Sequence, residues 1–207
     1  MGIVNYLTFL ITASIFVITP GLDTLFVLNK SVISGKRSGI KASLGVNTGV
    51  LTHTLFAALG LSVLIAQSEL IFTAVKYLGA SYLIFTGIKS LRKPATFSEN
   101  LPTENPNSKR KSDFWSGFLT NSLNPKVALF FMAFFPQFVT PEQLSSPLPF
   151  IILGVTYALI GVVWYLLLSV FAGNFSQKIK ENPNVSLWIN RVSGLLFILM
   201  GIQIAFT

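Results

Sequence analysis

A helix-breaking pair, Pro20-Gly21, lies inside an apolar run and is followed closely by a carboxylate, Asp23. A lipid bilayer would otherwise accept this run as one continuous helix. Proline inside a helix removes a backbone hydrogen bond and clashes with the preceding turn, and glycine loosens the same point. Backbone groups freed at membrane depth are tolerated only where protein or a wet cavity satisfies them. The break therefore predicts the lining of a site.

The composition indicates a membrane protein. Hydrophobic residues make up 52% of the 207 residues and charged residues only 11%, whereas soluble domains average roughly 25% charged residues. The sequence contains no cysteine, which excludes disulfides, thiolate metal sites and thiol redox chemistry. The N-terminus lacks the basic region and the small-residue cleavage site of a removable signal peptide, so we expect it to begin the first span.

About six segments of the length that a bilayer requires, roughly 20 apolar residues each, fit the sequence. We expect them over residues 3–28, 42–66, 70–88, 114–139, 148–172 and 187–206. The second segment carries small residues four positions apart, a spacing that lets helix backbones approach closely. Residues 93–112 are rich in proline and charge and poor in large apolar side chains, which predicts a disordered linker.

Basic residues are divided unevenly between the two ends of the predicted spans. The segments that follow the first, third and fifth spans hold thirteen Lys or Arg residues, and those that follow the second and fourth hold only Lys76. Because cytoplasmic loops carry an excess of Lys and Arg, we expect the linker in the cytoplasm and both termini outside. The net charge of +8 is thus explained by topology, and no nucleic-acid partner is expected.

The linker divides the chain into two halves, residues 1–92 and 113–207, with three predicted spans in each. An odd number of crossings gives the halves opposite orientations. The first span of each half carries a proline near mid-depth, Pro20 and Pro125. Discontinuous helices at matching positions indicate an inverted-repeat transporter with its site at the membrane midplane; the alternative is that each proline only kinks a packed helix. The predicted fold is all-α: a polytopic membrane protein of six transmembrane helices in two inverted three-helix repeats, with the first helix of each repeat broken at mid-membrane.

Lys126 lies about a dozen residues from either end of the fourth predicted span. A lysine at the centre of a membrane helix costs about 2.5 to 3.5 kcal/mol, so it needs a partner. If Asn124 caps a half-helix whose first residue is Pro125, Lys126 lies in the first turn, where the helix dipole favours an anion. A substrate carboxylate suits this place; a purely structural ion pair is the alternative.

Asp23 has two interpretations. It could simply cap the half-helix that starts after the break, where an acid is favoured. In the functional interpretation it balances Lys126 in the empty site, receives the ammonium group of the substrate and carries the coupling proton. One anion-binding and one cation-binding group at similar depth match a zwitterion.

Other polar residues lie within the predicted spans. His53 is the single histidine; it titrates near neutral pH and is a candidate for proton coupling, or it packs as a hydrogen-bonded histidine. Asn47 and Asn121 are predicted to line the site, with hydrogen bonding between helices as the alternative. The predicted substrate-binding residues are Pro20, Gly21, Asp23, Asn47, Asn121, Asn124, Pro125 and Lys126. No metal or cofactor site is predicted.

Much of the chain resembles the lysine exporter (LysE/RhtB-type) family of bacterial amino-acid exporters. The matching stretches are residues 19–53, 77–92, 116–139 and 190–206. The first and third contain the two breaks and form the specific part of the likeness. The resemblance implies a six-span carrier of the bacterial inner membrane that expels amino acids or similar metabolites using the proton gradient. Leu22 departs from the family pattern, which has a second proline there.

The predicted function is therefore that of a secondary exporter of an amino acid or a derivative, not an enzyme. Its expected partners are the substrate, protons and the lipid bilayer, with a homodimer as an open alternative for its assembly. A metal-ion exporter would need several oxygen ligands, whereas the apolar spans supply only Asp23. An intramembrane hydrolase would need Ser122 and His53 to be mutually oriented, and a non-catalytic scaffold would tolerate a neutral residue at 126.

Overall fold

The computed structural model describes residues 2–61, 69–92, 112–181 and 183–206. Residues 93–111 of the predicted linker lie outside this part of the chain. Within it the fold is all-helical, as predicted. The α-helices are α1 (Tyr6–Ile18), α2 (Leu22–Ile33), α3 (Lys36–Phe56), α5 (Glu69–Arg92), α6 (Asp113–Ser122), α7 (Pro125–Phe134), α8 (Pro147–Glu181) and α9 (Pro183–Phe206). Short helical elements follow α3 and α7: a π-helix, η1 (Ala57–Leu61), and two 3-10 turns, η2 (Phe135–Phe138) and η3 (Pro141–Gln143).

Both predicted helix interruptions are confirmed. Residues 19–21 separate α1 from α2, which are bent by 51° relative to each other. Leu123 and Asn124 separate α6 from α7. The predicted cap is also present, because the Asn124 side-chain oxygen accepts a 3.0 Å hydrogen bond from the backbone amide of Lys126. Pro125 takes the first helical position, where its missing N–H costs nothing.

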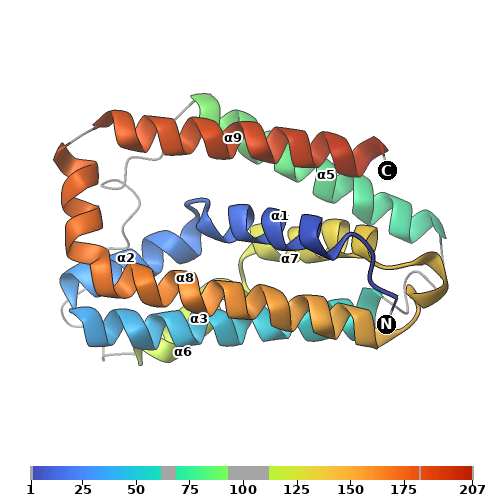
Figure 1. The fold of residues 1–207 in the computed structure, drawn as a ribbon, viewed down its shortest axis with the longest axis horizontal. Coiled ribbons are helices and arrows are strands. Elements are labelled where there is room, and N and C mark those ends of the chain that lie inside the picture. The colour runs from blue at the N-terminus through green and yellow to red at the C-terminus, as the bar shows by residue number, and fades with distance from the viewer. Residues whose placement is uncertain (1, 62–68, 93–111, 182, 207) are drawn as a thin grey trace.

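Successive passes of the chain run in opposite directions along the long axis of the molecule, and both termini lie at the same end (Figure 1). At that end the segment before α1 pairs with the segment after α7. The amide of Val4 donates a 2.9 Å hydrogen bond to the carbonyl of Phe138, and the amide of Thr140 donates a 2.8 Å bond to the carbonyl of Gly2. Ile3 and Val139 thereby form an antiparallel bridge.

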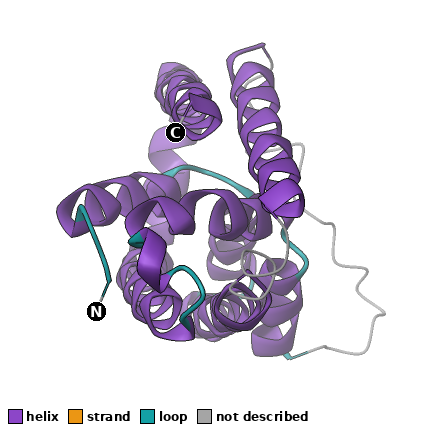
Figure 2. Cartoon of the chain, turned by 90° about the vertical axis from the view of Figure 1, so that its right-hand side faces the viewer, coloured by secondary structure: helices purple, strands orange, loops and turns teal. Residues whose placement is uncertain are grey.

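Glycines allow the closest helix contacts, as the small-residue spacing of the second predicted span indicates. A methyl group at Gly45 of α3 or at Gly117 of α6 would collide with a backbone carbonyl of the facing helix. Gly87 and Gly194 bring α5 and α9 together in the same way. The α5–α9 pair lies on one side of the remaining helices (Figures 1 and 2).

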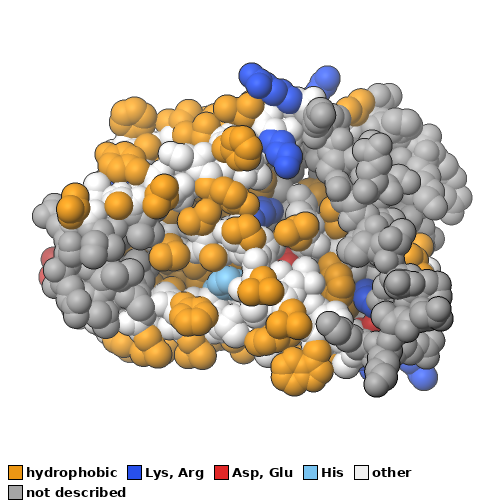
Figure 3. Space-filling model, turned by 180° about the vertical axis from the view of Figure 1, so that it is seen from behind, with side chains coloured by type: hydrophobic (Ala, Val, Ile, Leu, Met, Phe, Trp, Pro, Cys, Tyr) orange, Lys and Arg blue, Asp and Glu red, His pale blue; other side chains and the backbone are white. Residues whose placement is uncertain are grey.

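The interior is aromatic and the exterior is apolar. Phe16 of α1 and Phe130 of α7 stack with ring centroids 3.8 Å apart. Large side chains such as Leu7, Leu70 and Phe206 are 70%, 79% and 88% exposed. Apolar side chains are spread over much of the described part of the face in view, with a few Lys and Arg side chains among them (Figure 3). An apolar surface of this extent indicates contact with lipid.

Among the described residues, one helical stretch, Pro147–Ala172 of α8, is long and apolar enough to cross a membrane. Two stretches meet this test if α1 and α2 count as one bent span. α3 is less apolar because small and polar residues, including Ser43, Asn47 and Thr54, occupy its buried face. The number of six spans stays a prediction.

Candidate functional site

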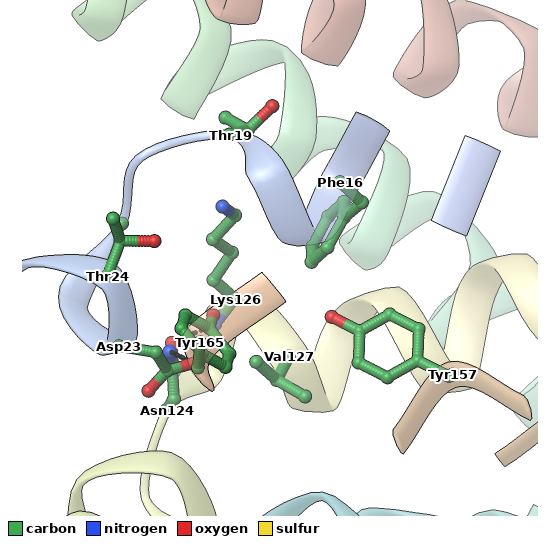
Figure 4. A pocket seen from close by; sticks show the side chains of 10 residues that line it. Phe16, Thr19, Asp23, Thr24, Asn124, Lys126, Val127, Tyr157 and Tyr165 are labelled. Atoms are coloured by element: carbon green, nitrogen blue, oxygen red, sulfur yellow. Dashed lines mark hydrogen bonds between the residues drawn. The ribbon is translucent and has the colours of Figure 1, made fainter. Parts of the chain in front are cut away.

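The two helix breaks meet at a small cavity. Its volume is about 10 Å³, roughly the room of a single water molecule. The lining side chains come from α1, α2, α7, α8 and the two breaks (Figure 4). They are Phe16, Thr19, Gly21, Asp23, Thr24, Asn124, Lys126, Val127, Tyr157 and Tyr165.

Asp23 lies buried in the first turn of α2. Its Oδ2 accepts hydrogen bonds from the side-chain amides of Asn121, at 2.9 Å, and Asn124, at 3.1 Å. Its Oδ1 is buried and has no hydrogen-bond partner among the described residues. The side chain does not cap α2, whose N-cap is Gly21. One carboxylate oxygen is thus fixed by two amides, and the other is left to bind something else.

Lys126 lies in the first turn of α7, two residues after the Asn124 cap. Its side chain extends toward Thr19 at the end of α1 (Figure 4). The ammonium lies 4.5 Å from the ring centroid of Phe16 and 4.6 Å from that of Phe197. In the part of the chain that the structure describes, it forms no hydrogen bond and no ion pair within 4.0 Å. Asp23 and Lys126 therefore face one cavity, with no ion pair within 4.0 Å between them.

His53 of α3 lies behind this cavity rather than in its lining. Its Nε2 donates a 2.9 Å hydrogen bond to the backbone carbonyl of Asn121, whose side chain holds Asp23. Ser122 contacts Thr52 instead, with 3.3 Å between the hydroxyl oxygens. The described contacts thus make His53 a residue that supports the site from behind. They do not pair it with Ser122, although a hydrolase would require that pair.

The cavity lining does not include four of the predicted lining residues: Pro20, Asn47, Asn121 and Pro125. Asn121 supports the site through its hydrogen bond to Asp23. Asn47 donates a 2.8 Å hydrogen bond to the carbonyl of Ser43 on its own helix and packs against Gly161 of α8. Pro20 is half-buried and Pro125 is exposed, and neither contributes to the lining. The prolines shape the backbone of the two breaks.

Two tyrosines of α8 are site residues that sequence reasoning missed. Tyr157 and Tyr165 are buried and line the cavity. Gly161 lies midway between them, and this four-residue spacing puts all three positions on one face of the helix. The sequence signal that could have identified them is the presence of tyrosine hydroxyls within an otherwise apolar predicted span.

The described residues contain no group of three or more His, Cys, Asp or Glu side chains that could hold a metal ion. The cavity offers one carboxylate, Asp23, together with the ammonium of Lys126. A divalent cation needs several oxygen ligands and is repelled by a neighbouring ammonium. The donor set therefore does not fit a metal.

A helical bundle with an apolar exterior and buried charges at two helix breaks is typical of membrane transport proteins. The chain belongs to the LysE type translocator family, which matches residues 14–207. It is therefore a membrane protein of a transporter family and not an enzyme, as the resemblance implied.

Relatives match the chain over nearly its whole length. It is 34% identical over 208 residues to the uncharacterized membrane protein YrhP of Bacillus subtilis, with 96% of this chain and 97% of the relative covered. It is 31% identical over 206 residues to the leucine efflux protein of Klebsiella pneumoniae, with 99% and 96% covered. An uncharacterized membrane protein of Vibrio cholerae is 30% identical over 205 residues, with 99% and 98% covered. The comparison with solved structures finds no significant match.

Proposed function

We propose that this protein exports an amino acid or a close derivative across the bacterial inner membrane in exchange for protons. The observation that carries the proposal is the meeting of Asp23 and Lys126 at one cavity formed by two helix breaks. The unpartnered Oδ1 of Asp23 is available for an ammonium group, and the ammonium of Lys126 for a carboxylate. The name of the leucine efflux relative supports an amino acid as the cargo.

The architecture that goes with this function has six spans in two inverted repeats, residues 1–92 and 113–207. The opposite directions of α1–α2 and α6–α7 and the position of both termini at one end support it (Figure 1). Lys36 and Arg37 at the start of α3 and Arg92 at the end of α5 belong to the basic segments. The excess of Lys and Arg in cytoplasmic loops supports a cytoplasmic location for the opposite end. Both termini then lie outside.

The cavity must enlarge for transport. About 10 Å³ holds one water molecule and no amino acid. The cavity is thus too small for cargo in this structure, and cargo enters only after helices around the cavity move apart. Alternating access of a central site to the two sides of the membrane requires such a movement.

Asp23 also supplies the coupling to protons in this scheme. It is the single carboxylate of the described lining. A proton and a substrate ammonium compete for the same carboxylate, because each neutralises its charge. Release of cargo outside thus accompanies protonation of Asp23, and loss of the proton inside prepares Asp23 for the next ammonium. His53, linked to Asp23 through Asn121, is the second candidate for proton coupling.

Counterflow in proteoliposomes tests the proposal. Vesicles containing the purified protein are loaded with one unlabelled amino acid at a time, and uptake of the same labelled amino acid is measured. We expect exchange of at least one amino acid, and Lys126→Met should slow it at least about tenfold through loss of a charged hydrogen bond. Glu142→Gln, at an exposed position, is the matched control. If the unchanged protein exchanges none of the amino acids, or Lys126→Met exchanges normally, the proposal is wrong.

A further inference from the structure

We propose that Phe16 and Phe197 are positioning residues that hold the ammonium of Lys126 ready for the anionic group of the cargo. The inference rests on the proposed function and adds to it two residues that no sequence motif singled out. They come from α1 and α9, helices far apart in the chain.

The geometry around the ammonium is that of a corner between two rings. Both rings are buried, and their centroids are 5.6 Å apart with the planes at 63°. The Lys126 nitrogen lies 4.5 and 4.6 Å from these centroids, so it is nearly equidistant from the two rings. A cation within about 6 Å of a ring face is attracted by the negative charge of that face.

Rings stabilise the charge without neutralising it. They supply no full negative charge, and the structure gives the Lys126 ammonium no carboxylate partner within 4.0 Å among the described residues. Gly21 borders another side of the ammonium: a Cβ there would lie only 3.1 Å from the nitrogen. The absence of a side chain at Gly21 therefore preserves the space through which an anion can approach.

The rings also keep two opposite charges apart. Asp23 and Lys126 line one cavity, and a lysine released from the rings would be drawn to the carboxylate. Such an ion pair would use both of the charges that a zwitterion needs. Phe16 and Phe197 thus maintain an anion-binding group that would otherwise be lost to an internal partner.

Fluorinated phenylalanines separate this electronic role from packing. Each added fluorine weakens the negative charge of the ring face, while the shape of the side chain changes little. Mono-, di- and trifluorophenylalanine are introduced at Phe197 or Phe16, and amino-acid counterflow is measured over a range of concentrations. We expect the apparent KM to rise stepwise, by about three- to tenfold in total, with a smaller change in maximal rate. The same series at Phe138, a buried ring that packs on Phe9 and Phe134, is the control. A KM that is flat across the series, or that changes equally at Phe138, overturns the proposal.

Thermal unfolding in detergent tests the contact independently of transport. The fluorinated series at Phe197 is measured in the unchanged chain and in Lys126→Met. We expect Tm to fall with fluorination only where the lysine is present. Equal trends in both backgrounds mean that the rings do not hold the ammonium. If the fall in Tm depends on the lysine but the protein exchanges no amino acid, the contact between rings and ammonium is supported and the proposed function is refuted.

Discussion

Asp23 of α2 accepts a 2.9 Å hydrogen bond from the side chain of Asn121 of α6, a residue 98 positions away. The carbonyl of the same asparagine accepts the hydrogen bond from His53 of α3. The position of the buried carboxylate is therefore set by both halves of the chain. A shift of α6 relative to α2 would change the partners of Asp23, as the proposed exchange of cargo and proton at this carboxylate requires.

Asp23→Asn should abolish proton-driven transport. The amide oxygen can still accept hydrogen bonds from Asn121 or Asn124, but it carries no charge for an ammonium group and takes up no proton near neutral pH. We expect a fall of at least about tenfold in apparent affinity, the effect of losing a charged hydrogen bond, and no stimulation by a pH gradient. Glu142→Gln should respond to the gradient like the unchanged protein. Full gradient-driven export by Asp23→Asn would remove Asp23 from the mechanism.

Asn124→Ala should destabilise the fold through two contacts at once. It removes the cap of α7, worth about 1 kcal/mol, and one hydrogen bond to a buried carboxylate, worth about 1.5 kcal/mol or more. The free energy of unfolding in detergent should fall by roughly the sum, about 2 to 3 kcal/mol. Ser145→Ala in an exposed turn serves for comparison. Equal stability of the two variants would contradict the double role of Asn124.

Gly45→Ala should weaken the contact between α3 and α6. The added methyl group collides with the carbonyl of Phe114, and overpacking of this kind costs typically about 1 to 3 kcal/mol. Thermal unfolding measures the loss as a lower Tm. Leu44→Ala, at an exposed position of the same helix, should change Tm much less. A larger loss at Leu44 than at Gly45 would mean that the close approach of these helices is wrong.

Lys30 and Asp113 join the end of α2 to the start of α6 through a 3.1 Å ion pair. The side chains are 9% and 21% exposed, so solvent screens the pair only in part. A double-mutant cycle with Lys30→Met and Asp113→Asn should give a coupling of about 0.5 to 1 kcal/mol at low salt, decreasing as ionic strength rises. Lys30→Met alone should cost more, because Lys30 has a further interaction. A coupling of zero at low salt would show that the pair contributes nothing.

The helix breaks were predictable because their signals are local. Pro20-Gly21 and Asn124-Pro125 act on the backbone of their own segments, whatever surrounds them. The cap on α7 follows from the same short-range chemistry. The pairing of helices depends instead on contacts between distant segments, so the sequence indicated that small residues pack closely but not that α3 meets α6.

The site was predictable in its charged residues and at the two helix breaks, where Gly21 and Asn124 line the cavity. Buried charges are rare in apolar helices, which made Asp23 and Lys126 conspicuous. Phe16 and Phe197 are two of 19 phenylalanines, and nothing in the sequence separates rings that face the site from rings that face lipid. Asn47 shows the opposite error, because the amide group of a polar side chain in a span can donate its hydrogen bond to its own helix instead of lining a cavity.

The backbone bridge between Ile3 and Val139 restricts how the molecule can open toward the side on which its termini lie. The two hydrogen bonds beside it tie the chain ahead of α1 to the chain beyond α7. Separating α1 from α7 at that end would break both bonds. If they stay intact, the two helices travel together, and an exit passage must form between them and the neighbouring α5, α8 or α9.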